Sequence, residues 1–392
     1  MGCQVMSRAD AEQRRVELER RVAATVHARA GELLEIRDQL YADPEVKWQE
    51  HASAQFLAAR LEHAGFSVDR GVAGLPTAFL GKSGSGSTRI GIMLEYDALP
   101  GMGHACGHNI IAAAGFGAAV ALAGVADDLD LTVEAIGAPA EEGGGGKVLM
   151  AEAGLFDGLE LAMMIHPGPT DAGWCRPLAV AHLDVHFAGR AAHASTYPER
   201  GVNANDAMVI AQVAMGLLRQ QLPESVRVHG IVSNAGEAPN AIPESATGHW
   251  YIRARTLAEL ERVFPRVIAC FEAGAHATGC SFSYQETSPR YSEFRNDEAL
   301  LELFGERAKE LGRDLDLEEQ NPGGMNTAST DMANVSLFTR AIHPYLGIDS
   351  LPVVNHQTEF AATTMTDAGA KAAIDGAILM ARTIVAEQSA RI

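Results

Sequence analysis

The segment GMGHACGHN, residues 101–109, places two histidines, one cysteine and one asparagine within the six positions from His104 to Asn109. Small and apolar residues follow, as in a buried helix. Imidazole and thiol groups at the start of such a helix contribute little to the packing of a hydrophobic core. Cys106 and His108 stand two positions apart in a glycine-containing turn, which can direct both side chains at one point. We therefore interpret Cys106 and His108 as candidate metal ligands, against the alternative of a helix N-cap that happens to contain histidine.

Two adjacent glutamates, Glu141 and Glu142, follow the next predicted strand in the segment APAEEGGGG, residues 138–146. Neighbouring side chains of an extended segment point to opposite sides. One glutamate can therefore bind a cation while the other stays free to carry a proton. The glycines indicate a tightly bent backbone or a close approach to a ligand. Taken alone, the segment is better explained as a solvated acidic turn.

Two further histidines complete the set of candidate ligands. His166 stands at the tip of a third predicted strand in MMIHPGP, and His356 lies in the polar loop PVVNHQTEFA. Either histidine alone would mean little. The carboxyl ends of strands in an open α/β sheet lie along one edge, where such folds place their ligands. We therefore expect these side chains to meet the two glutamates and the Cys-x-His turn.

The chemistry of this set predicts a metal site. Thiolate, imidazole and carboxylate groups together suit zinc, manganese or cobalt better than calcium or magnesium. Five candidate ligands and one spare carboxylate exceed the needs of a single tetrahedral site. Two divalent metal ions that share an activated water fit the set better.

The elements that must position these residues alternate between strands and helices, which predicts an α/β fold with a mostly parallel central sheet flanked by helices. A long charged helix is expected first, ending before Pro44. The expected order is a helix at 8–40, strands at 89–94, 131–137 and 161–166, intervening helices at 110–124 and 145–154, and a C-terminal helix at 366–388.

A different pattern interrupts this alternation at 178–290. Its first strand alternates apolar and polar residues, as in an antiparallel sheet with one open face. The order strand, helix, strand, strand, helix, strand predicts an inserted ferredoxin-like α+β domain. The metal-binding catalytic domain is then discontinuous and comprises 1–177 and 291–392.

The bulk composition agrees with two domains and excludes several classes of protein. The chain has 392 residues, of which 47% are hydrophobic, too many for one simple core. Fifty acidic against 31 basic residues give a formal charge of −19, which disfavours nucleic acid and anionic membranes as partners. The five scattered cysteines form no disulfide framework. With no apolar run typical of a secretory signal or a membrane span, we expect a cytoplasmic protein.

These residues resemble the co-catalytic, dinuclear metallopeptidase family of aminoacylase, succinyl-diaminopimelate desuccinylase and indole-acetyl-amino-acid hydrolases. The motif EYDALPGMGHACGHN is most similar to the branch of aminoacylase-like proteins and aminobenzoyl-glutamate hydrolases. The segments IRDQLYADPE, GRAAHASTYPERGVNANDA and NAIPESATGHWYIRA resemble other signatures of the family. The resemblance extends from about Arg37 to the C-terminus.

The resemblance implies a role for each residue of the metal site. Cys106 takes the bridging position that a carboxylate holds in many relatives, and Asp97 orients a ligand imidazole. Glu141 is the general base. The implied metal ligands are Cys106, His108, Glu142, His166 and His356. The branch usually has aspartate where this chain has Asn109, so no carboxylate role is expected there.

The resemblance also implies that the inserted domain is a lid and dimerisation domain, and three of its residues match the family's signatures. His193 resembles a histidine that reaches across a dimer interface to stabilise the oxyanion of the reaction. Asn240 and Arg253 match a pair that lies near the carboxylate of the substrate. This resemblance implies a homodimer or higher homo-oligomer and a small-molecule substrate that carries a carboxylate. His182 and His186 are expected to face solvent without a role.

The residues and the resemblance together predict a hydrolase that uses metal-activated water to cleave the amide bond of a small N-acyl amino acid, a dipeptide or an aryl-amide conjugate. Hydrolytic deamination of an aromatic or amidine carbon at the same site is an alternative. A non-catalytic metal-binding or ligand-sensing protein is an alternative of another class, but it would not need Glu141 as a base beside the ligands. A plain α/β domain with incidental histidines is the simplest alternative.

Overall fold

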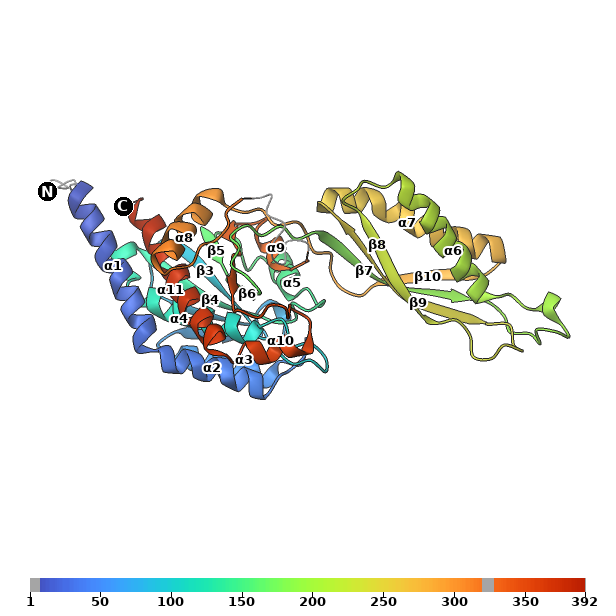
Figure 1. The fold of residues 1–392 in the computed structure, drawn as a ribbon, viewed down its shortest axis with the longest axis horizontal. Coiled ribbons are helices and arrows are strands. Elements are labelled where there is room, and N and C mark those ends of the chain that lie inside the picture. Colours follow the sequence, from blue (N-terminus) through green and yellow to red (C-terminus); the bar gives the residue numbers. More distant parts are fainter. Residues whose placement is uncertain (1–7, 319–327, 392) are drawn as a thin grey trace. The chain divides into compact units, whose positions relative to one another are not determined.

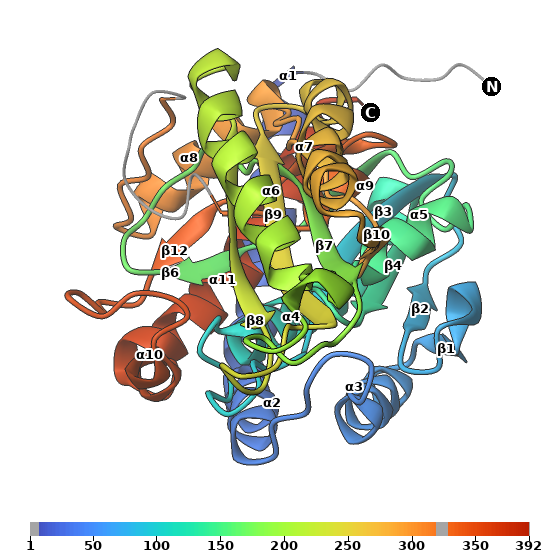
Figure 2. The same ribbon diagram turned by 90° about the vertical axis from the view of Figure 1, so that its right-hand side faces the viewer.

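A computed structural model describes residues 8–318 and 328–391 of the chain. Its contacts divide the chain into two compact units. The first unit comprises Met1–Arg176 and Phe294–Ile392, and the second comprises Pro177–Glu293. Each unit has its own sheet and its own helices (Figures 1 and 2). No helix in the described ranges combines the length and apolar character needed to span a bilayer.

The first unit is built on a six-stranded sheet with the order β1-β2-β4-β3-β5-β11. The strands β4, β3, β5 and β11 run parallel, whereas β1 and β2 add an antiparallel edge. The predicted fold class, a mostly parallel α/β sheet with flanking helices, is therefore confirmed. The strands are β1 (Ser67–Arg70), β2 (Phe79–Ser83), β3 (Thr88–Glu95), β4 (Leu131–Ala138), β5 (Leu161–Met163) and β11 (Arg340–Ile342).

The first unit also contains the helices that flank this sheet. They are α1 (Arg8–Ala28), α2 (Ala30–Ala42), α3 (His51–His63), α4 (His108–Ala123), α5 (Gly146–Glu152), α8 (Glu298–Glu310), α9 (Met332–Val335), α10 (Thr358–Thr363) and α11 (Asp367–Ser389). A separate two-stranded sheet pairs β6 (His166–Gly168) with β12 (Tyr345–Gly347) in parallel. Helices therefore flank the six-stranded sheet, and a separate small sheet begins at His166.

Two expectations about these elements were wrong in detail. The predicted single helix at 8–40 is two helices, because the backbone at Arg29 leaves the helical region, with φ −104° and ψ 10°. The predicted strand at 161–166 ends at Met163, and His166 begins β6 instead. The pairing partner changes at this break, from β11 for β5 to β12 for β6.

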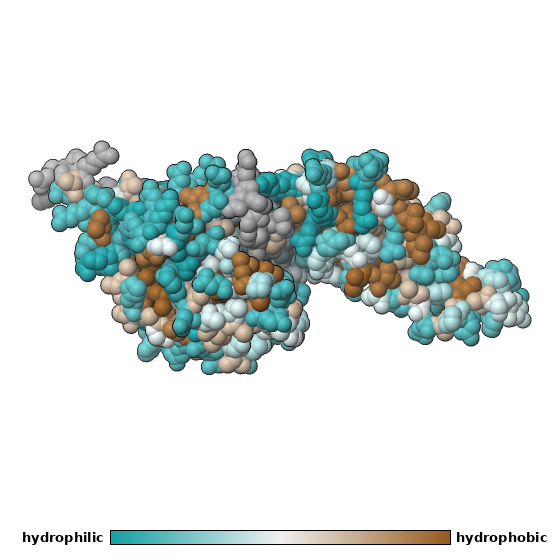
Figure 3. Space-filling model, in the orientation of Figure 1, coloured by the Kyte–Doolittle hydropathy of each residue, from teal (hydrophilic) through white to brown (hydrophobic). Residues whose placement is uncertain are grey.

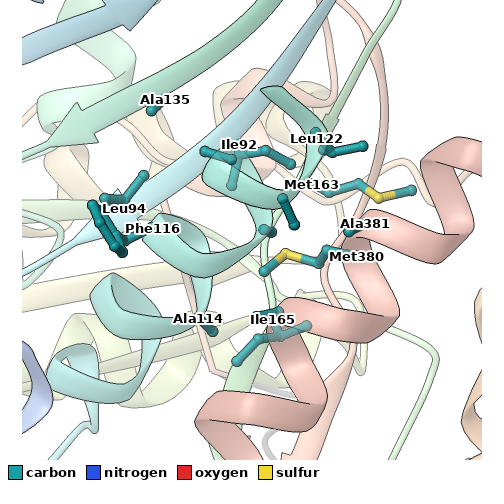
Figure 4. Close-up of a cluster of buried hydrophobic side chains, with 14 of the residues drawn as sticks. Ile92, Leu94, Ala114, Phe116, Leu122, Ala135, Met163, Ile165, Met380 and Ala381 are labelled. Carbon is teal, nitrogen blue, oxygen red and sulfur yellow. The ribbon is translucent and has the colours of Figure 1, made fainter. Parts of the chain in front are cut away.

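The strand β3 is buried on both faces, as its apolar sequence RIGIML requires in a parallel sheet. Ile90, Ile92 and Leu94 join the larger core, whereas Met93 joins a core on the opposite face. The larger core lies among β3, α4 and α11 (Figure 4). Almost every residue of α4 is buried there, so the helix that begins at His108 is fixed from all sides.

The second unit is a four-stranded antiparallel sheet with two helices. Its sheet order is β10-β7-β9-β8, and its chain order is strand, helix, strand, strand, helix, strand, as in a ferredoxin-like fold. Its elements are β7 (Ala179–Ala188), α6 (Ala204–Leu218), β8 (Arg227–Asn234), β9 (Ser245–Ala254), α7 (Leu257–Thr278) and β10 (Ser281–Glu286). Both helices cover one face of the sheet and share its core.

A glycine in α4 tests how closely this helix must lie against the sheet. A Cβ atom at Gly115 would come within 2.7 Å of the carbonyl oxygen of Met93 and 3.0 Å of Leu94 Cγ. We expect Gly115→Ala to lower the free energy of unfolding by about 1–3 kcal/mol, because the helix must shift. Thermal or urea unfolding measures this change.

Gly31 in α2 provides the matched control, since a Cβ there meets nothing within 4 Å. We expect Gly31→Ala to raise the free energy of unfolding by up to about 1 kcal/mol, because alanine favours a helix. Equal behaviour of the two variants would contradict the close packing of α4 on β3.

Candidate metal centre

The Cys-x-His turn joins β3 to α4 and packs against the start of β6. Gly107 between the two candidate ligands has φ +90°, which favours glycine. A Cβ at this position would lie 2.3 Å from Cγ of Pro167. This close approach brings Cys106 beside the next candidate ligand, with its Sγ 3.5 Å from Nε2 of His166.

The imidazole of His108 is buried and held by Asp97. Its Nδ1 lies 2.8 Å from the carbonyl oxygen and 3.0 Å from the carboxylate of Asp97. Nδ1 therefore carries the proton, which leaves Nε2 as the ligand atom. This Nε2 is buried without a hydrogen-bond partner. Although burial opposes both shifts, the contact between these groups lowers the pKa of Asp97, and Cys106 and Asp97 raise the pKa of His108.

His166 is also oriented for ligation through Nε2. Its Nδ1 donates to the carbonyl oxygen of Pro167 at 2.8 Å, so Nε2 is unprotonated and faces the sulfur of Cys106. Burial first, and then the neighbouring His343 and His108, lower the pKa of His166 to about 3. The ring is therefore neutral at pH 7, as a metal ligand must be.

The two glutamates follow β4 in a turn, and not in the extended segment that we expected. The argument that they point to opposite sides is therefore wrong. Glu141 Oε2 lies 3.8 Å and Glu142 Oε1 3.9 Å from Nε2 of His108. The backbone N–H of Glu142 donates to Asp97 Oδ2 at 2.9 Å. Burial, and then Glu95 and Glu142, raise the pKa of Glu141.

A buried carboxylate that the sequence did not reveal fixes this turn. Ala140 has φ 58°, a strained value for a residue with a Cβ. Its N–H donates to Glu50 Oε1 at 2.9 Å, and the hydroxyl of Thr77 donates to Glu50 Oε2 at 3.1 Å. Glu50 is fully buried. It therefore holds the backbone immediately before Glu141.

His356 reaches the site from a loop that other loops hold in place. Its Nε2 lies 3.4 Å from Glu142 Oε1, and its backbone N–H donates to the carbonyl oxygen of Ala105 at 2.9 Å. Asn355 next to it donates to the carbonyl oxygens of Cys106 and Pro167, both at 3.1 Å. The side-chain amide of Asn355 therefore connects the segments that carry Cys106, His166 and His356.

The structure brings together all five predicted ligands and Glu141. Within each of three groups, the ligand atoms lie within 4.8 Å of one another. Two ligands of one tetrahedral zinc ion, with bonds of about 2.0–2.3 Å, lie about 3.3–3.8 Å apart, close to the separations of 3.5, 3.8, 3.9 and 3.4 Å described above. The groups are Cys106, His108 and His166; Cys106, Glu142 and His356; and His108, Glu141 and Glu142. These residues therefore fit divalent cations.

Other residues of the motif take different places. Asn109 lies at the start of α4, where its side chain donates to the hydroxyl of Thr364 at 3.0 Å. It therefore anchors the helix to the chain beyond α10. His104 is buried, but it belongs to none of the three groups of candidate ligands found among the described residues.

The second unit carries His193 and Asn240 at one end of its sheet. His193 is exposed, and the N–H of Thr196 donates to its Nδ1 at 3.2 Å. The proton of the neutral ring is therefore on Nε2. The N–H of Ala194 donates to the carbonyl oxygen of Asn240 at 2.9 Å, so these two segments lie side by side.

Arg253 lies at the other end of the same sheet. It pairs with Val180 in the register of β9 with β7, whereas Ser245 pairs with Ala188. The eight residue steps from Ser245 to Arg253 span roughly 26 Å of strand. Asn240 precedes the Ser245 end, so one copy of the chain does not bring Asn240 and Arg253 together. Arg253 donates instead to Nε2 of His229 at 3.3 Å.

The expectation that His182 faces solvent was wrong. Its ring is buried and stacks on Tyr251 with 4.0 Å between ring centroids, and its Nδ1 lies 2.9 Å from the hydroxyl of Ser288. Residues that follow β10 cover this part of the face of the sheet that the two helices leave open. The alternating pattern of β7 does not reveal this cover.

Sequence reasoning also missed three buried charges behind the site. Glu95 is the last residue of β3, Lys147 is in α5, and Asp331 immediately precedes α9. Lys147 Nζ lies 2.6 Å from Glu95 and 2.5 Å from Asp331. An acidic residue at the end of an apolar strand was the available signal for Glu95. No local pattern indicates that distant Asp331 joins it.

Comparisons with known proteins agree with this fold and this set of residues. The model of peptidase family M20/M25/M40 matches residues 91–372. The Xaa-Arg dipeptidase of Mus musculus is 35% identical over 363 residues, which cover 88% of this chain and 84% of the dipeptidase. One of the polypeptides of the p-aminobenzoyl-glutamate hydrolase of Escherichia coli (strain K12) is 33% identical over 284 residues, covering 67% of this chain and 59% of that polypeptide.

A solved structure of a dinuclear metal binding peptidase of the M20 family from Bacillus subtilis has the same fold. Its TM-score is 0.68 at 22% sequence identity, with 92% of this chain and 99% of that chain covered. The chain belongs to the peptidase family M20/M25/M40. It is a metal-dependent hydrolase that acts on C–N bonds, as the sequence predicted.

Glu50 gives the site a testable dependence on pH. Burial first, and then Asp97, raise the pKa of Glu50 from 4.5 to about 7. Between these values the unfolded chain loses the proton that the folded chain keeps, so the free energy of unfolding falls as pH rises. We expect the free energy of unfolding to fall less with rising pH in Glu50→Gln than in the wild type, by up to about 3 kcal/mol. Urea unfolding at pH 5 and pH 8 without added metal measures the difference.

The Glu50→Gln variant removes the titrating group and keeps the hydrogen bond to the turn, because glutamine retains an oxygen that can accept from the N–H of Ala140. A parallel loss of stability with pH in wild type and Glu50→Gln would contradict the assignment of the raised pKa to this carboxyl group.

Proposed function

We propose that the chain is a dinuclear metal-dependent amidohydrolase that cleaves the amide bond of a small N-acyl amino acid, a dipeptide or an aryl-amide conjugate. The observation that carries this proposal is the convergence of five metal-ligand side chains around Glu141. The names of the relatives, a dipeptidase and an aminobenzoyl-glutamate hydrolase, support a substrate with an amide bond next to a carboxylate.

Cys106, His108, Glu142, His166 and His356 are the proposed ligands of two divalent cations. Cys106, His108 and Glu142 each belong to two of the three ligand groups, and the resemblance assigns the shared position to Cys106, whose sulfur would be available to both cations. Nε2 of His108 and Oε1 of Glu142 are buried without a hydrogen-bond partner. Such groups are costly to bury unless something binds them. Zinc, manganese and cobalt all suit this mixture of ligands.

When bound, the cations polarise the carbonyl oxygen of the substrate and lower the pKa of a water molecule. Glu141 takes a proton from this water and then gives it to the leaving nitrogen. Its raised pKa brings the carboxyl closer to the range in which it can both accept and donate a proton. Asp97 keeps His108 in the tautomer that presents Nε2.

His193 of the partner subunit is proposed to donate a hydrogen bond to the oxyanion through Nε2–H. The contact of Thr196 N–H with Nδ1 favours this tautomer. Arg253 and Asn240 are proposed to hold the carboxylate of the substrate. Because these two residues lie at opposite ends of β9, we infer that one subunit supplies Arg253 and its partner supplies Asn240.

The surface of the second unit supports a homodimer. Val209, Val213 and Leu217 are spaced four residues apart on α6 and are 47%, 59% and 71% exposed. Ile231 on the edge strand β8 is 64% exposed. Figure 3 shows apolar residues on the surface of this unit. A second copy of the chain would cover this apolar stripe and pair the free strand edge.

The roles of the two glutamates separate on substitution. We expect Glu141→Gln to lower kcat by at least about 10²-fold while both metal ions stay bound, because it removes only the proton carrier. We expect Glu142→Gln to lose metal as well as activity. Elemental analysis and steady-state kinetics on the same preparations measure both effects. Near-normal kcat in Glu141→Gln would exclude it as the base.

A substrate panel tests the reaction itself. We expect metal-loaded protein to hydrolyse some of the N-acyl amino acids, β-alanyl dipeptides and aminobenzoyl conjugates offered. Release of ammonia from substituted anilines or amidines, without amide cleavage, would favour deamination. Metal binding without turnover of any compound would favour the non-catalytic alternative.

The dimer can be tested on its proposed surface and on its proposed active site. We expect Val213→Asp to convert the dimer to a monomer in sedimentation experiments, because it places a charge in a buried apolar contact. Val16→Asp on α1, where Val16 is 52% exposed, is the matched control. Mixing His193→Ala with Glu141→Gln subunits should restore about one quarter of wild-type activity, since half the dimers then hold one intact site. Absence of restoration in verified mixed dimers would contradict the role of the partner's His193.

A further inference from the structure

A lysine without solvent contact lies between two carboxylates behind the proposed metal site. Lys147 is 0% exposed. Its Nζ contacts Glu95 Oε1 at 2.6 Å and Asp331 Oδ1 at 2.5 Å. The backbone N–H of Lys147 also donates to Asp331 Oδ2 at 2.9 Å. The three side chains together carry a formal charge of minus one.

A contribution to stability alone does not explain this buried cluster. Taking charged groups out of water costs several kcal/mol for each ion, and well-packed apolar residues often replace a buried ion pair without loss. Lys147 and Asp331 compensate each other through two contacts. Glu95 therefore holds a negative charge that the cluster itself leaves unbalanced.

The second oxygen of Glu95 faces His108. Glu95 Oε2 lies 3.4 Å from His108 Nε2, the ring nitrogen that the contact with Asp97 leaves free for a metal. This oxygen is buried and has no hydrogen-bond partner. Glu95 belongs to none of the three groups of candidate ligands in the described part of the chain. It therefore lies beside the ligand set and directs its charge toward it.

We propose that Glu95 is a positioning residue of the metal centre, held by Lys147 and Asp331 so that its charge stabilises the cation bound at His108. The inference rests on the proposed function, because it requires a cation at His108. Lys147 Nζ forms a close ion pair with one oxygen of Glu95, which favours the orientation that turns the other oxygen toward His108. Asp331 balances Lys147, so the negative charge of Glu95 is not cancelled.

Another buried glutamate in the first unit shows the contrast and supplies a control. Glu19 is also buried, but it contacts the guanidinium groups of Arg15, Arg307 and Arg382. Its charge is fully met by these partners in α1, α8 and α11. Glu19→Gln therefore matches Glu95→Gln in chemistry and burial, but it leaves the metal centre unchanged.

The experiment measures cation affinity without substrate. Each variant is stripped of metal, and the affinities for Zn²⁺ and Mn²⁺ are determined by competition with a chelator of known strength. We expect Glu95→Gln to weaken binding of at least one cation by about 10–100-fold, as removal of groups around metal ligands commonly does. Glu19→Gln should bind both cations as the wild type does. Wild-type affinity in folded Glu95→Gln would overturn the proposal.

Two further variants keep the result interpretable. Asp331→Asn brings the formal charge of the cluster to zero while preserving the shape of the side chain. We expect it to weaken cation binding as well, and unchanged affinity would overturn the proposal even if Glu95→Gln does not fold. His108→Ala tests the proposed function separately. If His108→Ala retains two tightly bound cations, the metal centre itself is wrong, whereas its loss of metal together with wild-type binding by Glu95→Gln rejects only the role of Glu95.

Discussion

The contact between His108 and Asp97 is the interaction on which the rest of the site depends. Asp97 receives Nδ1–H on one carboxylate oxygen and the backbone N–H of Glu142 on the other. One buried carboxylate therefore orients the imidazole and also positions the turn that carries both glutamates. Without this carboxylate, only the carbonyl oxygen of Asp97 would hold Nδ1–H of His108, and the turn after β4 would lose its link to the segment that follows β3. The parallel sheet explains why this contact is possible, because β3 and β4 pair up to Glu95 and Ala138 and the segments that leave them begin next to each other.

The sequence sufficed for the parts of the site that depend on short-range pattern. Cys106 and His108 are separated by one glycine, and each candidate ligand follows an apolar strand or lies in a recognisable motif. Strand ends and the family signatures together identified the five candidate ligands and Glu141. The order of elements likewise predicted the mostly parallel sheet, whose core around β3 and α4 holds the strand ends rigid. That rigidity matters because ligand atoms must keep their separations within a fraction of an ångström.

Other features depend on contacts between distant segments and had no local signal. The partner of Lys147 is Asp331, 184 residues away. The turn at Glu141 exists because Glu50 holds the strained Ala140, and a propensity argument treats that segment as extended. His182 is buried because Ser288 and its neighbours fold over the end of the sheet. In each case tertiary packing overrides the periodic pattern of the strand or loop.

The balance of buried charge links the metal centre to the fold. Glu95, Asp97, Glu141 and Asp331 are all buried in the first unit, and Lys147 is the single lysine buried with them in the described ranges. Imidazoles offset this excess only by taking up protons, which removes them as ligands. Under the proposed function, two divalent cations supply the missing positive charge and leave the histidines neutral. Cation binding then stabilises the folded chain, since the unfolded chain does not bring these carboxylates together. The acidity that makes the site costly to fold is the same property that gives it affinity for metal.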